Sequence, residues 1–145
     1  SSCPISAKSS SIKNKVNLLV MPENYLPFEW LPILARTCAK NQMALVTGIE
    51  HLKIKNKMNK CVVSNLTAII LPYVEEDYKF SYIHFHNKRH FAPNERVSIE
   101  SYRYEILEGS QYELFNWNDF WFPVYCCYEL TSIMDRAIFN LMRMQ

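Results

Sequence analysis

The order of the first apolar segments constrains the fold of this chain most strongly. Residues 16–20 form a short apolar run, typical of a strand that is buried on both faces of a sheet. An apolar stripe at helical spacing follows, and residues 43–47 form a second short apolar run that Gly48 ends. A strand, a helix and a strand in this order are typical of a crossover between parallel strands. We therefore predict an α/β fold with an open sheet, helices on one face and a second sheet, from this chain or from outside it, on the other.

The rest of the chain alternates between strand patterns and turns and ends in an amphipathic helix. Alternating lysines at residues 53–60 indicate a solvated hairpin turn rather than a nucleic-acid patch. A helix is expected to begin near Ser132, where Ser132 and Asp135 resemble a capping box. The predicted strands are residues 49–54, 61–71, 82–86, 112–117 and 121–126, and residues 92–110 are expected to be mostly loop.

Composition limits the domain count and the classes of partner. The chain has 145 residues, which fits one domain, and its 49% hydrophobic content excludes a disordered tail. A net charge of +2 makes nucleic acid or an anionic membrane an unlikely main partner. Residues 1–15 are expected to be a poorly structured, serine-rich lead-in to a single domain.

The cysteines and apolar stretches indicate a reducing compartment. Five cysteines without regular spacing argue against a secreted disulfide framework, and no Cys-x-x-Cys metal motif occurs. The longest uncharged apolar-rich stretch, residues 61–74, is shorter than the roughly 20 residues that span a bilayer. We therefore expect a cytoplasmic protein without a membrane partner. With only two glycines, the chain also lacks a glycine-rich loop for phosphate.

Three reactive side chains follow predicted strands. Glu23 comes after residues 16–20, Lys88 after residues 82–86, and Cys127 directly after residues 121–126. In open α/β sheets, functional groups gather beyond the carboxyl ends of the strands, so these three side chains could meet at one rim.

Together the three groups are suited to the attack on an unreactive carbon–nitrogen bond. A carboxylate can take the proton of a thiol, and an ammonium can stabilise the oxyanion that the thiolate forms. Each residue alone has a common structural explanation: Glu23 as a solvated turn residue, Lys88 as a surface lysine and Cys127 as a small buried hydrophobe.

Four segments resemble the nitrilase superfamily of carbon–nitrogen hydrolases, and three of them carry its catalytic motifs. Residues 18–24, Leu-Leu-Val-Met-Pro-Glu-Asn, resemble the segment of its general-base glutamate, and residues 44–50 resemble the next strand. Residues 88–95, Lys-Arg-His-Phe-Ala-Pro-Asn-Glu, resemble its lysine motif. Residues 124–129, Val-Tyr-Cys-Cys-Tyr-Glu, resemble its nucleophile motif. The three motifs also occur in the order of that family.

This resemblance implies a role for each site residue. Cys127 would be the nucleophile, Glu23 the proton shuttle and Lys88 the oxyanion stabiliser, while Glu95 would orient Lys88 and Tyr128 would contribute its backbone N–H. Strand alternation leaves open which of the doubled cysteines faces the site, and the Cys-Tyr-Glu match selects Cys127. The implied reaction is hydrolysis of a small amide or nitrile through a thioester or thioimidate, without a cofactor.

The resemblance also implies a larger architecture. The family fold is a four-layer α-β-β-α sandwich, of which this chain would hold the N-terminal and central half, and it pairs into homo-oligomers or larger assemblies. Residues 130–136 lack the aromatic-proline step of common amidases and look more like nitrilase-like domains of multidomain proteins, including some phage-defence reverse transcriptases. The alternative function is therefore a catalytically silent binding or assembly module.

A metal site is the remaining alternative. His84 and His86 share one strand face, as two ligands would, with His90 and His51 as further candidates. A closed zinc site needs four well-placed donors, and the sequence offers no obvious fourth.

Overall fold

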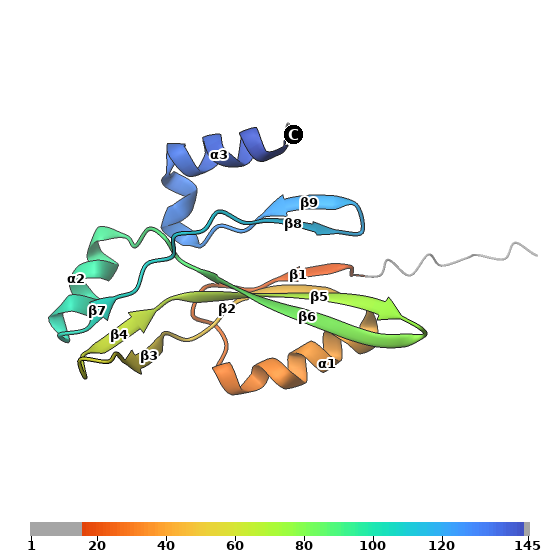
Figure 1. The fold of residues 1–145 in the computed structure, drawn as a ribbon, viewed down its shortest axis with the longest axis horizontal. Helices are drawn as coiled ribbons and strands as arrows, with labels where there is room; N and C mark the ends of the chain where they lie inside the picture. Colours follow the sequence, from red (N-terminus) through yellow and green to blue (C-terminus); the bar gives the residue numbers. More distant parts are fainter. Residues whose placement is uncertain (1–15, 144–145) are drawn as a thin grey trace, which may run out of the picture.

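The computed structural model describes residues 16–143, which form a mixed α/β structure (Figure 1). Its helices are α1 Leu31–Asn41, α2 Pro93–Ser101 and α3 Ile133–Arg143, with short 3-10 helices η1 Phe28–Trp30 and η2 Cys127–Thr131. Its strands are β1 Leu18–Val20, β2 Ala44–Gly48, β3 Leu52–Lys55, β4 Cys61–Ser64, β5 Leu66–Glu75, β6 Tyr78–Asn87, β7 Glu105–Ile106, β8 Leu114–Trp117 and β9 Phe120–Pro123. The predicted lead-in, residues 1–15, lies outside the described residues.

The main sheet contains four strands in the order β1-β2-β5-β6. Strand β1 pairs with β2 in parallel across helix α1, which confirms the predicted crossover. Because β5 is antiparallel to both β2 and β6, strand β6 runs in the same direction as β1 and β2. The carboxyl ends of β1, β2 and β6 therefore lie at one edge of the sheet.

Helix α1 covers one face of this sheet. Its apolar stripe packs against alternate residues of the central strands, and Leu31, Cys38, Leu45, Ala68 and Ile70 are buried there. The apolar stripe that predicted the helix is thus the side of the helix that is buried against the sheet. Gln42 ends the helix in the left-handed conformation, with φ 49°.

The hairpin β8–β9 lies over part of the opposite face, with Val46 and Ile69 buried against Phe122 and Val124 (Figure 1). The second sheet that was predicted on this face is therefore supplied in part by the chain itself. The hairpin lies where two strands were predicted, but β9 ends at Pro123 rather than at residue 126. Its turn residues Asn118 and Asp119 have φ 50° and 61°. Strand β1 is an edge strand with Val20 67% exposed, so its predicted burial on both faces is also wrong.

Two further segments differ from their predictions. The expected strand 61–71 is two strands that diverge at Asn65, because β4 joins a second sheet with the order β3-β4-β7. The expected loop 92–110 contains helix α2, which begins with Pro93 and buries only Ile99. A helix with one buried residue has a weak amphipathic pattern, which is why the sequence did not indicate it.

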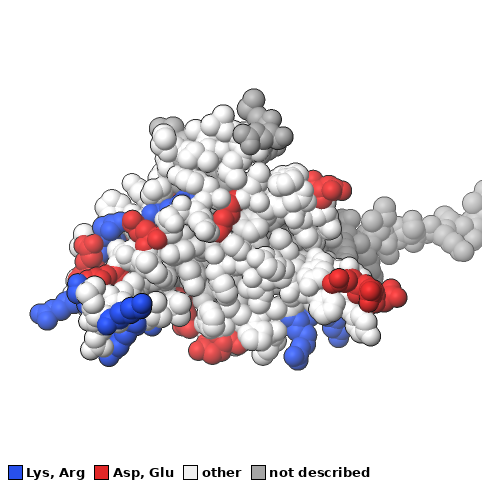
Figure 2. Space-filling view, in the orientation of Figure 1, with Lys and Arg blue, Asp and Glu red and all other residues white. Residues whose placement is uncertain are grey.

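The face shown in Figure 2 has no large patch of one charge, because acidic and basic side chains alternate at the left end and along the lower edge. Between residues 16 and 143, no helix combines the length and the hydrophobicity needed to cross a bilayer.

Candidate active site

Glu23 is placed by a close contact between two chain segments at the carboxyl edge of the sheet. The N–H of Gly48, the last residue of β2, donates to the carbonyl of Pro22 over 3.0 Å. A Cβ on Gly48 would lie 2.4 Å from the Cα of Glu23, so only glycine allows this approach. This contact holds Glu23 at the carboxyl edge of the sheet, just after the end of β1.

Lys88 follows β6 at the same edge and is completely buried. Its Nζ lies 2.7 Å from Oε1 of Glu23 and 2.6 Å from Oε2 of Glu95. A buried ammonium is costly unless it is paired and hydrogen-bonded, and these two carboxylates pair it. The structure thus brings together the glutamate and lysine segments and the second glutamate, as the sequence predicted.

Asn65 is a site residue that the sequence analysis did not identify. Its Nδ2 donates to Oε1 of Glu23 over 2.5 Å and to Oε1 of Glu95 over 3.0 Å, and its side chain is fully buried. It lies at the break between β4 and β5, and its backbone carbonyl accepts from the N–H of Lys88 over 2.9 Å. The available signal was an amide within a predicted buried strand, since a buried polar group needs partners.

Glu95 lies in the first turn of helix α2. The position of its carboxylate is therefore fixed by a helix, although this segment was expected to be loop. Its Oε2 also accepts from the backbone N–H of Ala92 over 3.4 Å, and His51 Nε2 lies 3.8 Å from its Oε1. A cavity of about 220 Å³ adjoins Glu95 and is lined by Val63, Ile99, Tyr102 and other side chains of β3, β4 and α2.

The two adjacent cysteines have different environments. Cys126 is buried, 4% exposed, whereas Cys127 is exposed and begins η2 with φ 47°. A positive φ is uncommon for a residue with a side chain, and such strain concentrates at functional sites. The turn therefore presents the thiol of Cys127 to solvent and keeps that of Cys126 inside.

Both thiols interact with the Glu23 carboxylate. Burial raises the pKa of Cys126 strongly, and the negative charge of Glu23 adds to this effect. The pKa of Cys127 is raised by partial burial, by the charge of Glu23 and by a hydrogen bond to Glu23, while Lys88 opposes this change. Cys127 is therefore within proton-exchange contact of Glu23 and is a neutral thiol at rest.

The charges of the carboxylate and the ammonium stabilise each other. Burial alone would raise the pKa of Glu23, but hydrogen bonds from Lys88 and Asn65 and the charge of Lys88 outweigh it, so the pKa is lowered. Burial alone would lower the pKa of Lys88, but its bonds to Glu23 and Glu95 raise it. At neutral pH the cluster consists of carboxylate, ammonium and thiol.

Tyr128 follows Cys127 within η2, and its side chain is 39% exposed. Its backbone therefore lies next to the presented thiol, where the sequence analysis placed an oxyanion donor. A cavity of about 310 Å³ adjoins Tyr128, His90 and Phe91.

A second buried network connects the cysteine turn to the lysine segment, and the sequence analysis did not predict it. Oε2 of Glu129 accepts from the N–H of Cys126 over 2.6 Å, and its Oε1 accepts from the N–H of Arg89 over 2.7 Å. His86 Nε2 lies 2.9 Å from Oε2 of Glu129. Glu129 was recognised only as part of the Cys-Tyr-Glu motif, and its partners His86 and Arg89 are far away in the sequence.

The alternative metal site does not form. His84 and His86 both contact Glu113 instead, and His51 lies near Glu95. The part of the chain that the structure describes contains no group of three side chains that could hold a metal ion.

Comparisons of the chain with protein-family models, with curated proteins and with solved structures find no match. The geometry of the site is therefore the basis for the functional assignment that follows.

Proposed function

We propose that this chain is a cysteine-dependent hydrolase of non-peptide carbon–nitrogen bonds, of the nitrilase type, with Cys127 as nucleophile. The observation that supports this most is the fully buried Lys88 ammonium between Glu23 and Glu95, next to a thiol that contacts Glu23. Cys127 is chosen over Cys126 because its thiol is exposed on a strained turn. A small amide or nitrile is the proposed substrate.

The first step forms a carbon–sulfur bond. Glu23 takes the thiol proton of Cys127 as the sulfur attacks the amide carbon, so the carboxylate becomes a carboxylic acid and the carbonyl oxygen becomes an oxyanion. Lys88 and the backbone N–H of Tyr128 stabilise this oxyanion. Because the thiol is neutral at rest, proton transfer accompanies the attack rather than preceding it.

The second half of the cycle restores the enzyme. Glu23 returns the proton to the nitrogen, the carbon–nitrogen bond breaks, and ammonia or an amine leaves a thioester on Cys127. Glu23 then takes a proton from water, the resulting hydroxide attacks the thioester, and the thiolate leaves and recovers that proton. With a nitrile, the Glu23 proton passes to the nitrogen as the carbon–sulfur bond forms, which gives a thioimidate. One water then adds to the thioimidate carbon, ammonia leaves, and the same thioester remains to be hydrolysed by a second water.

Asn65 and Glu95 position the reacting groups in this proposal. Asn65 holds both carboxylates by its amide, and Glu95 holds the ammonium together with Glu23. A small acyl group could occupy the cavity of about 220 Å³ beside Glu95.

We also propose that the chain forms part of a nitrilase-type α-β-β-α sandwich within an oligomer or a larger protein. The side of the main sheet that carries β8–β9 still exposes Tyr73, Phe80 and Tyr82 by 45%, 44% and 56%. A further layer on this side would bury these aromatic side chains.

The test is the release of ammonia from a panel of short aliphatic and aromatic primary amides and nitriles. The proposal predicts that the wild-type chain releases ammonia from at least one compound and that Cys127→Ala releases none. Cys61→Ala, a change on β4, is the matched control and should retain activity. Release by Cys127→Ala at the wild-type rate would contradict Cys127 as the nucleophile. No release from any compound would instead support the silent module.

A further inference from the structure

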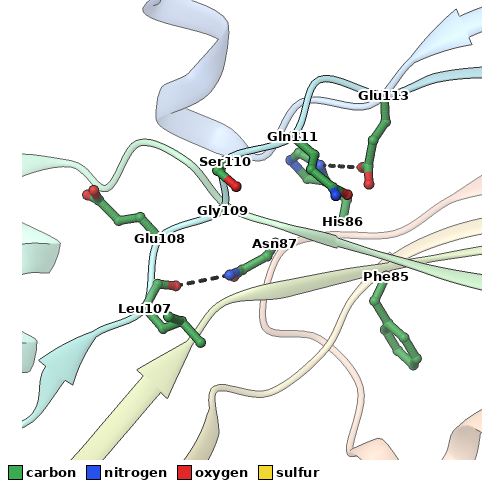
Figure 3. A pocket seen from close by; sticks show the side chains of 9 residues that line it. All are labelled: Phe85, His86, Asn87, Leu107, Glu108, Gly109, Ser110, Gln111 and Glu113. Atoms are coloured by element: carbon green, nitrogen blue, oxygen red, sulfur yellow. Dashed lines mark hydrogen bonds and ion pairs between the residues drawn. The ribbon is translucent and has the colours of Figure 1, made fainter.

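His86 lies between two carboxylates, and each of its ring nitrogens faces one of them. Nε2 is 2.9 Å from Oε2 of Glu129, and Nδ1 is 2.9 Å from Oε2 of Glu113 (Figure 3 shows the contact with Glu113). A carboxylate only accepts hydrogen bonds, so both ring nitrogens must donate. With both glutamates ionised, this geometry fits the doubly protonated imidazolium, which is buried at 1% exposure on β6.

The contact with Glu129 connects this imidazolium to the site. The same Oε2 that accepts from His86 also accepts from the N–H of Cys126, the residue before Cys127. The other oxygen of Glu129 accepts from the N–H of Arg89, the residue after Lys88. Glu129 thus fixes the cysteine turn to the lysine segment, and His86 holds Glu129.

The contact with Glu113 connects the imidazolium to a surface segment. Residues 107–111 and Glu113 line a cavity of about 240 Å³ together with Phe85, His86 and Asn87 (Figure 3). Glu113 is 15% exposed, whereas Glu129 is completely buried. The contact with Glu113 is therefore the one that can separate when the ring loses a proton.

We propose that the protonated form of His86 is a positioning device for Cys127, acting through Glu129. This inference rests on the proposed function in taking Cys127 as the reactive thiol. When the ring loses its proton, one nitrogen lone pair faces a carboxylate and the contact with Glu113 opens. The ring is then no longer fixed from both sides, so its hold on Glu129 weakens and the cysteine turn loosens. Cys127 then loses reactivity relative to that of an ordinary thiol at the same pH.

The charged groups around His86 favour the protonated form. Burial opposes it, but hydrogen bonds and charge from Glu129 and Glu113 outweigh burial, so the pKa of His86 is raised. Arg89 lies against Glu129, with its Nη2 3.6 Å from Oε1 of Glu129. His84, which is on β6 with His86, has its Nε2 2.6 Å from Oε1 of Glu113. Thr67 of β5, the register partner of His86, carries no charge.

The test measures two titrations on the same intact chain. Ring NMR of isotope-labelled histidine gives the pKa of His86, and the rate of alkylation of Cys127 by iodoacetamide, mapped by mass spectrometry, gives its reactivity against pH. For a lone thiol, the logarithm of this rate rises steadily with pH until the thiol ionises. The proposal predicts a downward bend in the wild-type profile at the pKa of His86.

Two substitutions separate positioning from a purely structural role. Glu113→Gln removes one negative charge at a partly exposed position, so the NMR titration and the bend should move together to lower pH, by about one unit. His86→Gln should remove the bend, and His84→Gln should leave it in place. A bend that stays fixed while the His86 titration moves, or a ring that is neutral at pH 6, would overturn the proposal. Because alkylation requires no turnover, these results do not depend on whether the chain hydrolyses amides.

Discussion

The ammonium of Lys88 lies 2.7 Å from the carboxylate of Glu23, although 65 residues separate them in the sequence. The contact exists because β1 and β6 run in the same direction and end at the same edge of the sheet. Residues that follow such strands can therefore lie close together even when they are far apart in the sequence. This pair is the structural basis of the predictions below.

Lys88→Met should destabilise the fold. It leaves Glu23 and Glu95 without their shared cation, and removing one partner of a buried ion pair costs about 3 kcal/mol or more. Urea unfolding followed by circular dichroism measures the loss. The double variant Lys88→Met with Glu95→Gln should regain part of the stability without regaining Cys127 reactivity. Equal stability of Lys88→Met and wild type would contradict the arrangement.

Asn65→Asp should be more damaging than Asn65→Ala. The alanine removes two hydrogen bonds to charged groups, each worth about 1.5 to 3 kcal/mol, whereas the aspartate adds a third negative charge between Glu23 and Glu95. Thermal unfolding measures both variants. Asn41→Ala, at an exposed position at the end of α1, is the control and should change stability by less than about 1 kcal/mol.

Cys126→Ser and Cys127→Ser should separate the two thiols. Cys127→Ser should abolish rapid labelling by iodoacetamide, because Cys126 is buried and its pKa is strongly raised. Cys126→Ser should retain that labelling, with some loss of stability. Rapid labelling of Cys126 in the folded Cys127→Ser variant would assign the reactive thiol to Cys126.

Stability should decline on both sides of neutral pH, for different reasons. The pKa values of Glu23 and Glu129 are lowered by folding, so their contribution is present above the ordinary carboxyl pKa and is lost as pH falls through the folded values. The pKa of His86 is raised, so its contribution is present below its ordinary value of roughly 6.5 and is lost as pH rises through the folded value.

Urea unfolding between about pH 3 and about pH 9 measures this dependence. His86→Gln should flatten the alkaline decline between the two pKa values of His86 and leave the acid decline in place. An unchanged alkaline decline in that variant would show that another group causes it.

Gly48→Ala should disturb the site more than its small size suggests. The new Cβ would lie 2.4 Å from the Cα of Glu23 and 2.6 Å from the backbone nitrogen of Asn24, so the backbone must shift. Overpacking of this kind costs about 1 to 3 kcal/mol. The variant should be less stable in urea and slower in Cys127 alkylation, and a wild-type alkylation rate would argue against tight placement of Glu23.

The sequence predicted the parts of the fold that have strong local patterns. A clear hydrophobic period or turn signal marks three of these parts. They are the crossover from β1 through α1 to β2, the lysine-rich turn between β3 and β4, and the hairpin β8–β9. The convergence of Glu23 and Lys88 was also predictable, because it follows from the direction of the strands rather than from side-chain detail.

Other features depend on contacts that no local pattern shows. Helix α2 buries only Ile99, and β4 leaves the main sheet at Asn65 to join β3 and β7. The roles of Asn65 and His86 arise from side chains that are between 27 and 43 residues away. Buried polar residues such as these indicate that partners exist, but they do not identify them.

The central claim is that Cys127 attacks a carbonyl carbon with the help of Glu23 and Lys88. Brief exposure to 4-nitrophenyl acetate, followed by peptide mass mapping, tests it without knowledge of the natural substrate. We predict one acetyl group on Cys127 in the wild-type chain, formed together with a burst of 4-nitrophenolate, and a much slower reaction in the Glu23→Gln variant. Acetylation spread over several cysteines and lysines, or an unchanged rate in Glu23→Gln, would contradict the account.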